Sequence, residues 1–234
     1  MIQPEPLSIS VDDGQSVSGL LQLPHDARAC YVMAHGAGAG MTHPFMAAFA
    51  ADLAARSIAT LRYQFPYMEK GSHRPDPPKI AHATVRAAVA EASRRLPELA
   101  LYAGGRSFGG RMTSQAQAAA PLPAVRGLAF LAFPLHPSGE PADSRGEHLA
   151  DVLVPMLFVQ GTRDELAHLA LLQALVARLA PRATLELLAD ADHAFHVPAR
   201  TGRKDPEVRA AAAEAIARWI AEMASGRTSP ALST

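Results

Sequence analysis

This sequence of 234 residues lacks several features that would point to particular classes of protein. It holds one cysteine, Cys30, so an internal disulfide is excluded, and the apolar run around it predicts a small buried side chain rather than a reactive thiol. No run of 18 apolar residues occurs, which argues against a transmembrane helix. The amino terminus carries neither a basic region nor a continuous apolar stretch, so we expect a cytoplasmic protein with no membrane partner.

An excess of charge of either sign is also missing. The chain has 22 basic and 22 acidic residues, for a formal net charge of zero, and therefore no electrostatic attraction for nucleic acid. No cluster of His, Cys, Asp and Glu has the spacing of metal ligands, so we expect no metal site and no cofactor. We find no internal repeat.

What the sequence does contain is an alternation of short apolar runs with longer amphipathic ones. Before this alternation, a turn at 12–15 favours a hairpin. Alternating strands and helices imply an α/β fold with a mainly parallel sheet covered on both faces. The predicted strands are 7–11, 17–23, 29–34, 58–63, 99–103, 127–133, 156–160 and 184–188. The predicted helices are 44–56, 78–95, one from 107 that ends before Pro121, 165–179 and 206–224.

No linker divides the chain, so we predict one domain over residues 1–225 and a flexible carboxyl-terminal tail over 226–234. Two irregular stretches, 64–78 and 134–151, interrupt the alternation. Stretches of this length at the carboxyl ends of strands can shape a ligand pocket, although they can also be solvated excursions.

The pentapeptide Gly105-Arg106-Ser107-Phe108-Gly109 has the form G-x-S-x-G. Alone it is a weak signal, because glycine turns are common. Here it lies between a predicted strand and a predicted helix, where a strained turn can project a serine hydroxyl, and Gly104 and Gly110 fit close packing of that helix on the strands. This context predicts Ser107 as a nucleophile.

A nucleophilic serine needs a histidine base and an acid that orients the histidine. Asp164 follows the strand 156–160 through a short turn, and His193 follows the strand 184–188. Parallel strands bring Ser107, Asp164 and His193 to the same edge of the sheet. The rival base is His196, and the rival acids are Glu165, Asp190 and Asp192; each fits its preceding strand less well.

Two backbone N–H groups are candidates for holding an oxyanion: that of Phe108, after the nucleophile, and that of Ala37, in the glycine-rich turn His35 to Gly40. That turn could instead be a flexible loop or a phosphate cradle, but its spacing fits neither a P-loop nor a dinucleotide fingerprint. We expect His35 to brace the turn rather than transfer protons.

Residues that follow the strand ends are candidates for a substrate pocket, although each could be structural. The apolar candidates are Phe65, Tyr67, Met68, Phe108, Leu135 and Phe195. Arg106 or Arg62 could meet an anion.

At these positions the chain resembles the α/β-hydrolase superfamily, and within it the dienelactone-hydrolase-like group and the KANL/TEX-type hydrolase-like family. The resemblance runs from about residue 15 to 222. The segments that carry it are 35–40, 62–67, 104–110, 161–164 and 192–195. It departs from dienelactone hydrolases at Ser107, where their usual nucleophile is cysteine.

The resemblance implies a three-layer α/β/α sandwich around an eight-stranded sheet, with the second strand antiparallel and little or no cap. It also implies a serine hydrolase that cleaves a small ester or thioester, with a small acyl compound as its partner. Two alternatives stay open at this point: a non-catalytic interaction module with the hydrolase fold, and an acyltransferase that uses the same three residues. Both a monomer and a homodimer fit the sequence.

Overall fold

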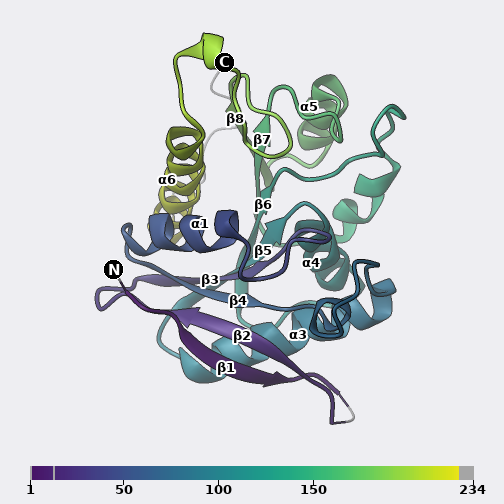
Figure 1. The fold of residues 1–234 in the computed structure, drawn as a ribbon. Coiled ribbons are helices and arrows are strands. Elements are labelled where there is room, and N and C mark those ends of the chain that lie inside the picture. Colours follow the sequence, from purple (N-terminus) through teal and green to yellow (C-terminus); the bar gives the residue numbers. More distant parts are fainter. Residues whose placement is uncertain (1, 13, 227–234) are drawn as a thin grey trace.

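The computed structural model describes residues 2–12 and 14–226, which form an eight-stranded sheet with helices on both faces (Figure 1). The strands are β1 (Glu5–Ser10), β2 (Ser16–Gln22), β3 (Ala29–Ala34), β4 (Ile58–Tyr63), β5 (Ala100–Arg106), β6 (Val125–Leu131), β7 (Met156–Gly161) and β8 (Ala183–Leu188). Their order in the sheet is β1-β2-β4-β3-β5-β6-β7-β8. β2 is antiparallel to both its neighbours and the pairs from β4 to β8 are parallel, which confirms the predicted topology.

The helices form the outer two layers. They are α1 (Pro44–Ala54), α2 (Pro66–Glu69), α3 (Pro78–Arg95), α4 (Phe108–Ala119), α5 (Leu169–Arg178) and α6 (Asp205–Ala224), with 3₁₀ helices η1 (Ser144–Asp151) and η2 (Ala199–Thr201). Helices α1 and α6 cover one face, where Phe49 and Trp219 belong to the same core cluster. Helices α3, α4 and α5 cover the other face and contribute Val85, Met112 and Leu175 to a second cluster. The α/β/α sandwich expected from the sequence is therefore confirmed.

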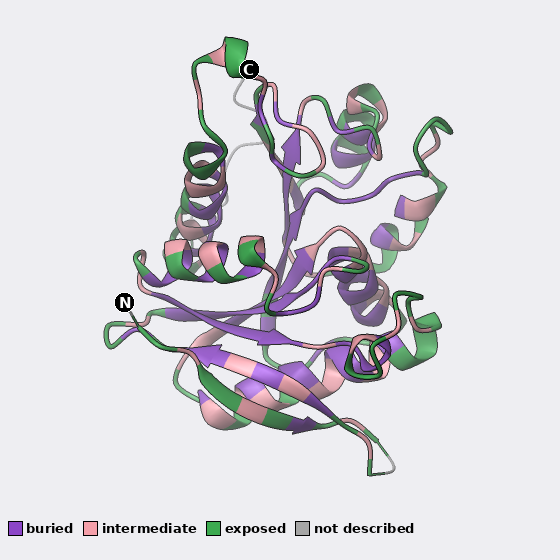
Figure 2. Cartoon of the chain, viewed as in Figure 1, coloured by how far each residue is buried: buried purple, intermediate pink, exposed green. Residues whose placement is uncertain are grey.

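Burial follows the layers (Figure 2). The central strands β3, β4 and β7 are buried at every residue, as expected for parallel strands with helices on both faces. Strand β1, at the edge of the sheet, has mostly exposed residues. Cys30 lies in β3 and is fully buried, and burial raises the pKa of its thiol to about 12, so it is the inert small side chain that the sequence predicted.

Most predicted elements form close to their expected positions, and β3, β4 and α3 have the predicted bounds. Strand β5 continues past its predicted end at Ala103 to Arg106. It passes very close to its neighbours, since a Cβ on Gly104 would lie 1.8 Å from the Ala129 carbonyl oxygen and one on Gly105 would lie 2.2 Å from that of Ala34. Only glycine permits this approach.

Two further elements differ from the prediction in where they begin or end. The helix predicted over 165–179 begins only at Leu169. His168, which comes just before it, has an extended ψ of 120° and cannot belong to the helix, and its N–H donates to the His136 ring. Strand β6 ends at Leu131 rather than at 133, because Ala132 takes a left-handed φ of 53°.

The excursion between β6 and β7, the larger of the two irregular stretches, contains only η1. Within the described residues, this fold therefore carries no large cap over the carboxyl edge of the sheet. Of the predicted tail, only Gly226 belongs to the described residues, and 227–234 lie outside them. None of the helices that the structure describes is both long and apolar enough to cross a lipid bilayer.

Candidate active site

Ser107 occupies the sharp turn between β5 and α4, with φ 49° and ψ −117°. A non-glycine residue in this conformation is strained, and such strain persists only where surrounding contacts hold the backbone. Helix α4 is held against β3, because a Cβ on Gly109 would lie 2.5 Å from the His35 carbonyl oxygen. A Cβ on Gly110 would lie 2.8 Å from the Gly105 oxygen, so the flanking glycines are required by close packing, as predicted.

A chain of hydrogen bonds links Ser107, His193 and Asp164. The His193 Nε2 lies 2.9 Å from the Ser107 Oγ, and its Nδ1 lies 2.8 Å from Asp164 Oδ2 and 3.0 Å from Oδ1. A carboxylate only accepts hydrogen bonds, so Nδ1 carries the proton toward Asp164 and Nε2 is free to accept one from the serine hydroxyl. The structure thus brings together the three residues that the sequence separates by as much as 86 positions.

The Asp164 carboxylate is fully buried and held on three sides. Its Oδ2 accepts from the Gln160 Nε2 at 2.5 Å, and its Oδ1 accepts from the Leu166 N–H at 2.8 Å, in addition to the His193 contacts. Gln160 is fixed in turn, because its Oε1 accepts from the Phe133 N–H at 2.8 Å. The sequence analysis missed Gln160, although a lone amide in an otherwise apolar strand was a signal that could have found it.

The rival residues have other partners. The imidazole of His196 is 61% exposed and bonds to Asp205, 2.9 Å away. The Asp192 carboxylate accepts the N–H groups of Ala194 and His196, which shapes the loop that carries His193. Among the described residues, the carboxylate that bonds to His193 is that of Asp164.

The turn from His35 to Gly40 lies beside the serine, since a Cβ on Gly36 would be 3.8 Å from the Ser107 Cβ. His35 braces this turn as predicted: its Nδ1 donates to the Gly36 carbonyl at 2.8 Å and its Nε2 accepts the Phe65 N–H at 3.1 Å. This pairing fits a neutral ring, and burial lowers the pKa of His35 to about 4. Phe108 begins α4, where backbone N–H groups have no partner within the helix. The roles of Ala37 and Phe108 stay predictions.

The expected wall residues divide into two groups. Phe65, Leu135 and Phe195 are almost fully buried in the core, so in this structure they support the site from behind and present no surface to a ligand. Tyr67 is also buried, at 3% exposed, but its hydroxyl reaches the turn and accepts the Gly38 N–H at 3.3 Å, while Met68 is half-buried. Met68 and Phe108, which are half-buried, remain predicted apolar walls, and Tyr67 contributes its hydroxyl to the turn.

Arg106 supports the histidine loop. Its guanidinium donates to the His193 carbonyl at 3.3 Å and stacks 4.5 Å from the centre of the Phe45 ring. A cation over an aromatic face is attracted by the ring quadrupole. Burial lowers the pKa of Arg106, while Asp192 and Asp164 oppose this effect. These contacts of Arg106 are structural, and its binding of a substrate anion stays a prediction.

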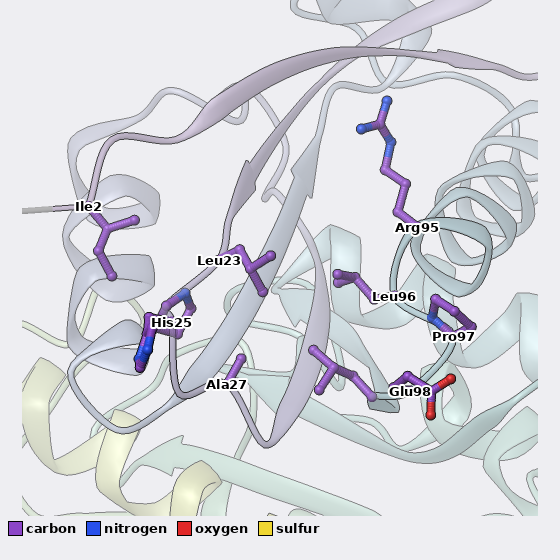
Figure 3. Close-up of a pocket in the computed structure, with 10 residues that line it drawn as sticks. Ile2, Leu23, His25, Ala27, Arg95, Leu96, Pro97 and Glu98 are labelled. Carbon is purple, nitrogen blue, oxygen red and sulfur yellow. The ribbon is translucent and has the colours of Figure 1, made fainter.

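A hollow of about 550 Å³ opens elsewhere on the molecule, at the amino ends of the parallel strands (Figure 3). It is lined by Leu23, Ala27 and residues 95–99, which precede β3 and β5, whereas Ser107 follows β5. It therefore belongs to a different part of the fold. Within residues 2–12 and 14–226, no three His, Cys, Asp or Glu side chains are grouped so as to hold a metal ion.

Comparison with known proteins places this arrangement in context. Residues 27–221 match the model of a family described as an alpha/beta hydrolase domain. Solved structures with the same fold include an alpha-beta serine hydrolase homologue from Coxiella burnetii (18% identity, TM-score 0.72, covering 92% of this chain and 99% of that one). Another is a dienelactone hydrolase from Anabaena variabilis (19% identity, TM-score 0.71, covering 97% of this chain and 99% of that one). A third is an a/b serine hydrolase without lid from Xanthomonas campestris (22% identity, TM-score 0.71, covering 93% of this chain and 95% of that one).

Proposed function

Because the chain belongs to the alpha/beta hydrolase family, we propose that it is a serine hydrolase that cleaves small esters or thioesters through an acyl-enzyme. The observation that carries this proposal is the chain of hydrogen bonds from Ser107 through His193 to Asp164. A serine, an imidazole and a buried carboxylate in this arrangement form a nucleophile, its base and the group that orients the base.

In the first half of the reaction, the Ser107 Oγ attacks the acyl carbonyl while the His193 Nε2 accepts its proton. The buried Asp164 carboxylate stabilises the imidazolium that results and keeps the ring in the required tautomer. His193 then gives the proton to the leaving alcohol or thiol, and the acyl group remains on Ser107. In the second half, a water molecule loses its proton to His193 and attacks the acyl-enzyme, which releases a carboxylic acid and restores Ser107.

The tetrahedral intermediates of both halves carry a negative oxygen. The N–H groups of Phe108 and Ala37 are our candidates for its donors, because Phe108 is at the start of α4 and the turn that contains Ala37 lies against Ser107. Loss of one such donor costs about 3–4 kcal/mol of transition-state stabilisation in measured cases. His35 holds this turn in place and does not take part in proton transfer.

The absence of a large cap from the described residues supports a small or exposed acyl group, because no element among them encloses a long substrate above the carboxyl ends of the strands. Two of the structures with the same fold agree with this choice: the Anabaena protein is a dienelactone hydrolase, and the Xanthomonas protein is a hydrolase without lid. A series of p-nitrophenyl esters with lengthening acyl chains would define the preferred length.

A fluorophosphonate probe tests the proposal directly. We expect one covalent adduct, found by mass spectrometry on the peptide that contains Ser107 and lost in Ser107→Ala. Ser114 offers a matched control on α4, the helix that follows Ser107, since its hydroxyl also lies close to an imidazole, 2.7 Å from that of His148. Ser114→Ala should still be labelled. Folded wild-type protein that takes no label would contradict the proposal.

A further inference from the structure

Arg62 is a charged residue that the active site does not use. It lies on β4 and is only 2% exposed. Its Nη1 donates to the Met41 carbonyl at 3.1 Å, whereas its Nε is sealed from solvent and has no partner. No carboxylate among the described residues forms an ion pair with it. Neither Nε nor Nη2 forms a hydrogen bond to a described residue.

The polar side chains nearest to Arg62 in the sheet register do not neutralise it. Thr60 is two residues earlier on β4, so its side chain points to the same face, and its buried Oγ1 also has no hydrogen-bond partner. Gln22 pairs with Thr60 across the antiparallel β2–β4 ladder and is 6% exposed. Three buried polar side chains thus lie together on a face where the rest of the core is apolar.

Arg62 and Gln22 line a hollow of about 480 Å³ between β2, α1 and the start of the chain. Figure 1 shows the amino-terminal segment running beside α1 and β2 at this place. The other residues that line it are Ile2, Gln3, Pro4, Ala47, Ala51, Ala54 and Ala55. None of them carries a charge, and none belongs to the site around Ser107. The volume lies within the range of about 300–1,000 Å³ that is typical of small-molecule sites.

A buried charge without a partner is costly, and burial accordingly lowers the pKa of Arg62. A carboxylate relieves this cost best, because its two oxygens match the parallel N–H groups of a guanidinium edge. Phosphate is a poorer match, since Arg62 is the one charged side chain among the described residues that line the hollow, and it would leave a dianion half-neutralised. The alanines of α1 and the apolar residues Ile2 and Pro4 offer walls for a hydrocarbon chain.

We propose that this hollow binds a carboxylate carried on a short unbranched alkyl chain, with the carboxylate on Arg62 and the chain along α1. The proposal concerns binding at a second site and does not depend on the activity proposed for Ser107.

Octanoate is a suitable probe, with octanol and inorganic phosphate as comparisons. We expect octanoate to bind wild-type protein in calorimetry and to raise its melting temperature, because a ligand that binds the native state stabilises it. Octanol lacks the charge and phosphate lacks the chain, so both should bind at least about tenfold more weakly. Phosphate or octanol binding as tightly as octanoate would overturn the proposal, as would the absence of octanoate binding.

Two variants locate the site. Ala51→Leu places a larger side chain on an exposed position of α1 that lines the hollow, and should weaken octanoate binding about tenfold or more without unfolding the protein. Ala119→Leu makes the same change on an exposed position of α4 and should bind like the wild type. Both variants should keep wild-type ester hydrolysis. Equal octanoate binding by Ala51→Leu and the wild type would place the ligand elsewhere and contradict the proposal. Arg62→Met, if folded, should also lose the preference for octanoate over octanol.

Discussion

At the scale of single residues, His193 and His196 show how closely alternative bases can lie in the chain. They are three positions apart, and the same loop carries both, yet only His193 contacts the Ser107 Oγ and the Asp164 carboxylate. His196 faces solvent and bonds to Asp205. The choice between them depends on which way each imidazole points, and the bonds from the Asp192 carboxylate to two N–H groups of the loop set that direction.

This pair supplies a matched test. His193→Ala should lower kcat for a p-nitrophenyl ester by about 10⁴-fold or more, because the serine loses its base. His196→Ala should keep kcat within a few-fold of the wild type, because His196 bonds to Asp205 and not to the serine. Its exposed ion pair also contributes little to stability. Both variants should unfold at temperatures close to the wild type. Comparable losses of kcat in the two variants would contradict the assignment of the base.

Gln160 and Arg106 are residues whose importance depends on contacts rather than on a motif. Gln160 joins the Asp164 carboxylate to the Phe133 N–H, and Arg106 joins the His193 carbonyl to the Phe45 ring. Each pair links segments that are far apart in the sequence. The amide in an apolar strand singles out Gln160, but its partners and those of Arg106 could not be predicted, because local pattern does not reveal what faces a side chain across a sheet.

At the scale of elements, helix α4 determines where Ser107 is placed. The helix begins one residue after the serine and packs against β3 and β5 through glycines that leave no room for a Cβ. The strand, the turn and the helix were all predictable, because β5 is an apolar run and the residues after it have helical periodicity. The closeness of the packing was predictable only in outline, from the glycines around the serine.

Gly109 gives a test of this packing. In Gly109→Ala, the added Cβ would meet the His35 carbonyl oxygen at 2.5 Å, so α4 must shift away from β3. We expect a loss of about 1–3 kcal/mol in the free energy of unfolding, together with a fall in kcat as Ser107 moves from His193. Gly36→Ala is the control for stability, because its nearest contact would be an ordinary 3.7 Å. Urea denaturation measures the free energy of unfolding of both variants and of the wild type. A Gly109→Ala protein as stable as the wild type would contradict the expectation.

Helix α5 shows the limit of periodicity. The apolar spacing extends back to residue 165, and the helix was predicted to begin there, but the N–H groups of Leu166 and His168 bond to side chains of Asp164 and His136. The helix begins late because His168 has an extended ψ of 120°, and only its acceptor, His136, is distant in the chain. The bond from Leu166 holds Asp164 in position, so the error in the predicted helix arises beside the candidate site.

At the scale of the whole molecule, two buried histidines connect stability with pH. Burial lowers the pKa of His35 and of His148 from the ordinary 6.5 to about 4, and at His148 the charges of Arg111 and His82 add to the effect. In the unfolded chain both rings take up a proton below pH 6.5, while the folded protein keeps them neutral until about pH 4. Protons therefore favour the unfolded state within this range.

We expect the free energy of unfolding to fall as the pH is lowered from 6.5 to 4, with His35 alone contributing about 3 kcal/mol. His148→Gln should make this fall shallower, because it removes one of the two groups. His196→Gln should not, since Asp205 raises the pKa of His196 and its linkage has the opposite sign. Denaturant titrations at pH 7, 5.5 and 4.5 measure the slopes. A wild-type stability that stays constant over this range would contradict the linkage.

By itself, the sequence determined the alternation of strands and helices, the eight strands and the order of Ser107, Asp164 and His193 along the chain. These follow from local causes: hydrophobic periodicity, glycine at tight turns and the position of polar residues just after apolar runs. Such signals act over a few residues, so they can be read without knowing what packs against them.

Only the tertiary structure decided which histidine meets the serine, that Gln160 holds the acid, and that Phe65, Leu135 and Phe195 lie in the core. It also showed that Arg62 is buried without a charged partner beside a hollow. These facts depend on strand order and register, which place residues from distant parts of the chain side by side. A hydrogen bond or the burial of a charge depends on several such residues at once, so it cannot be predicted from the local sequence pattern.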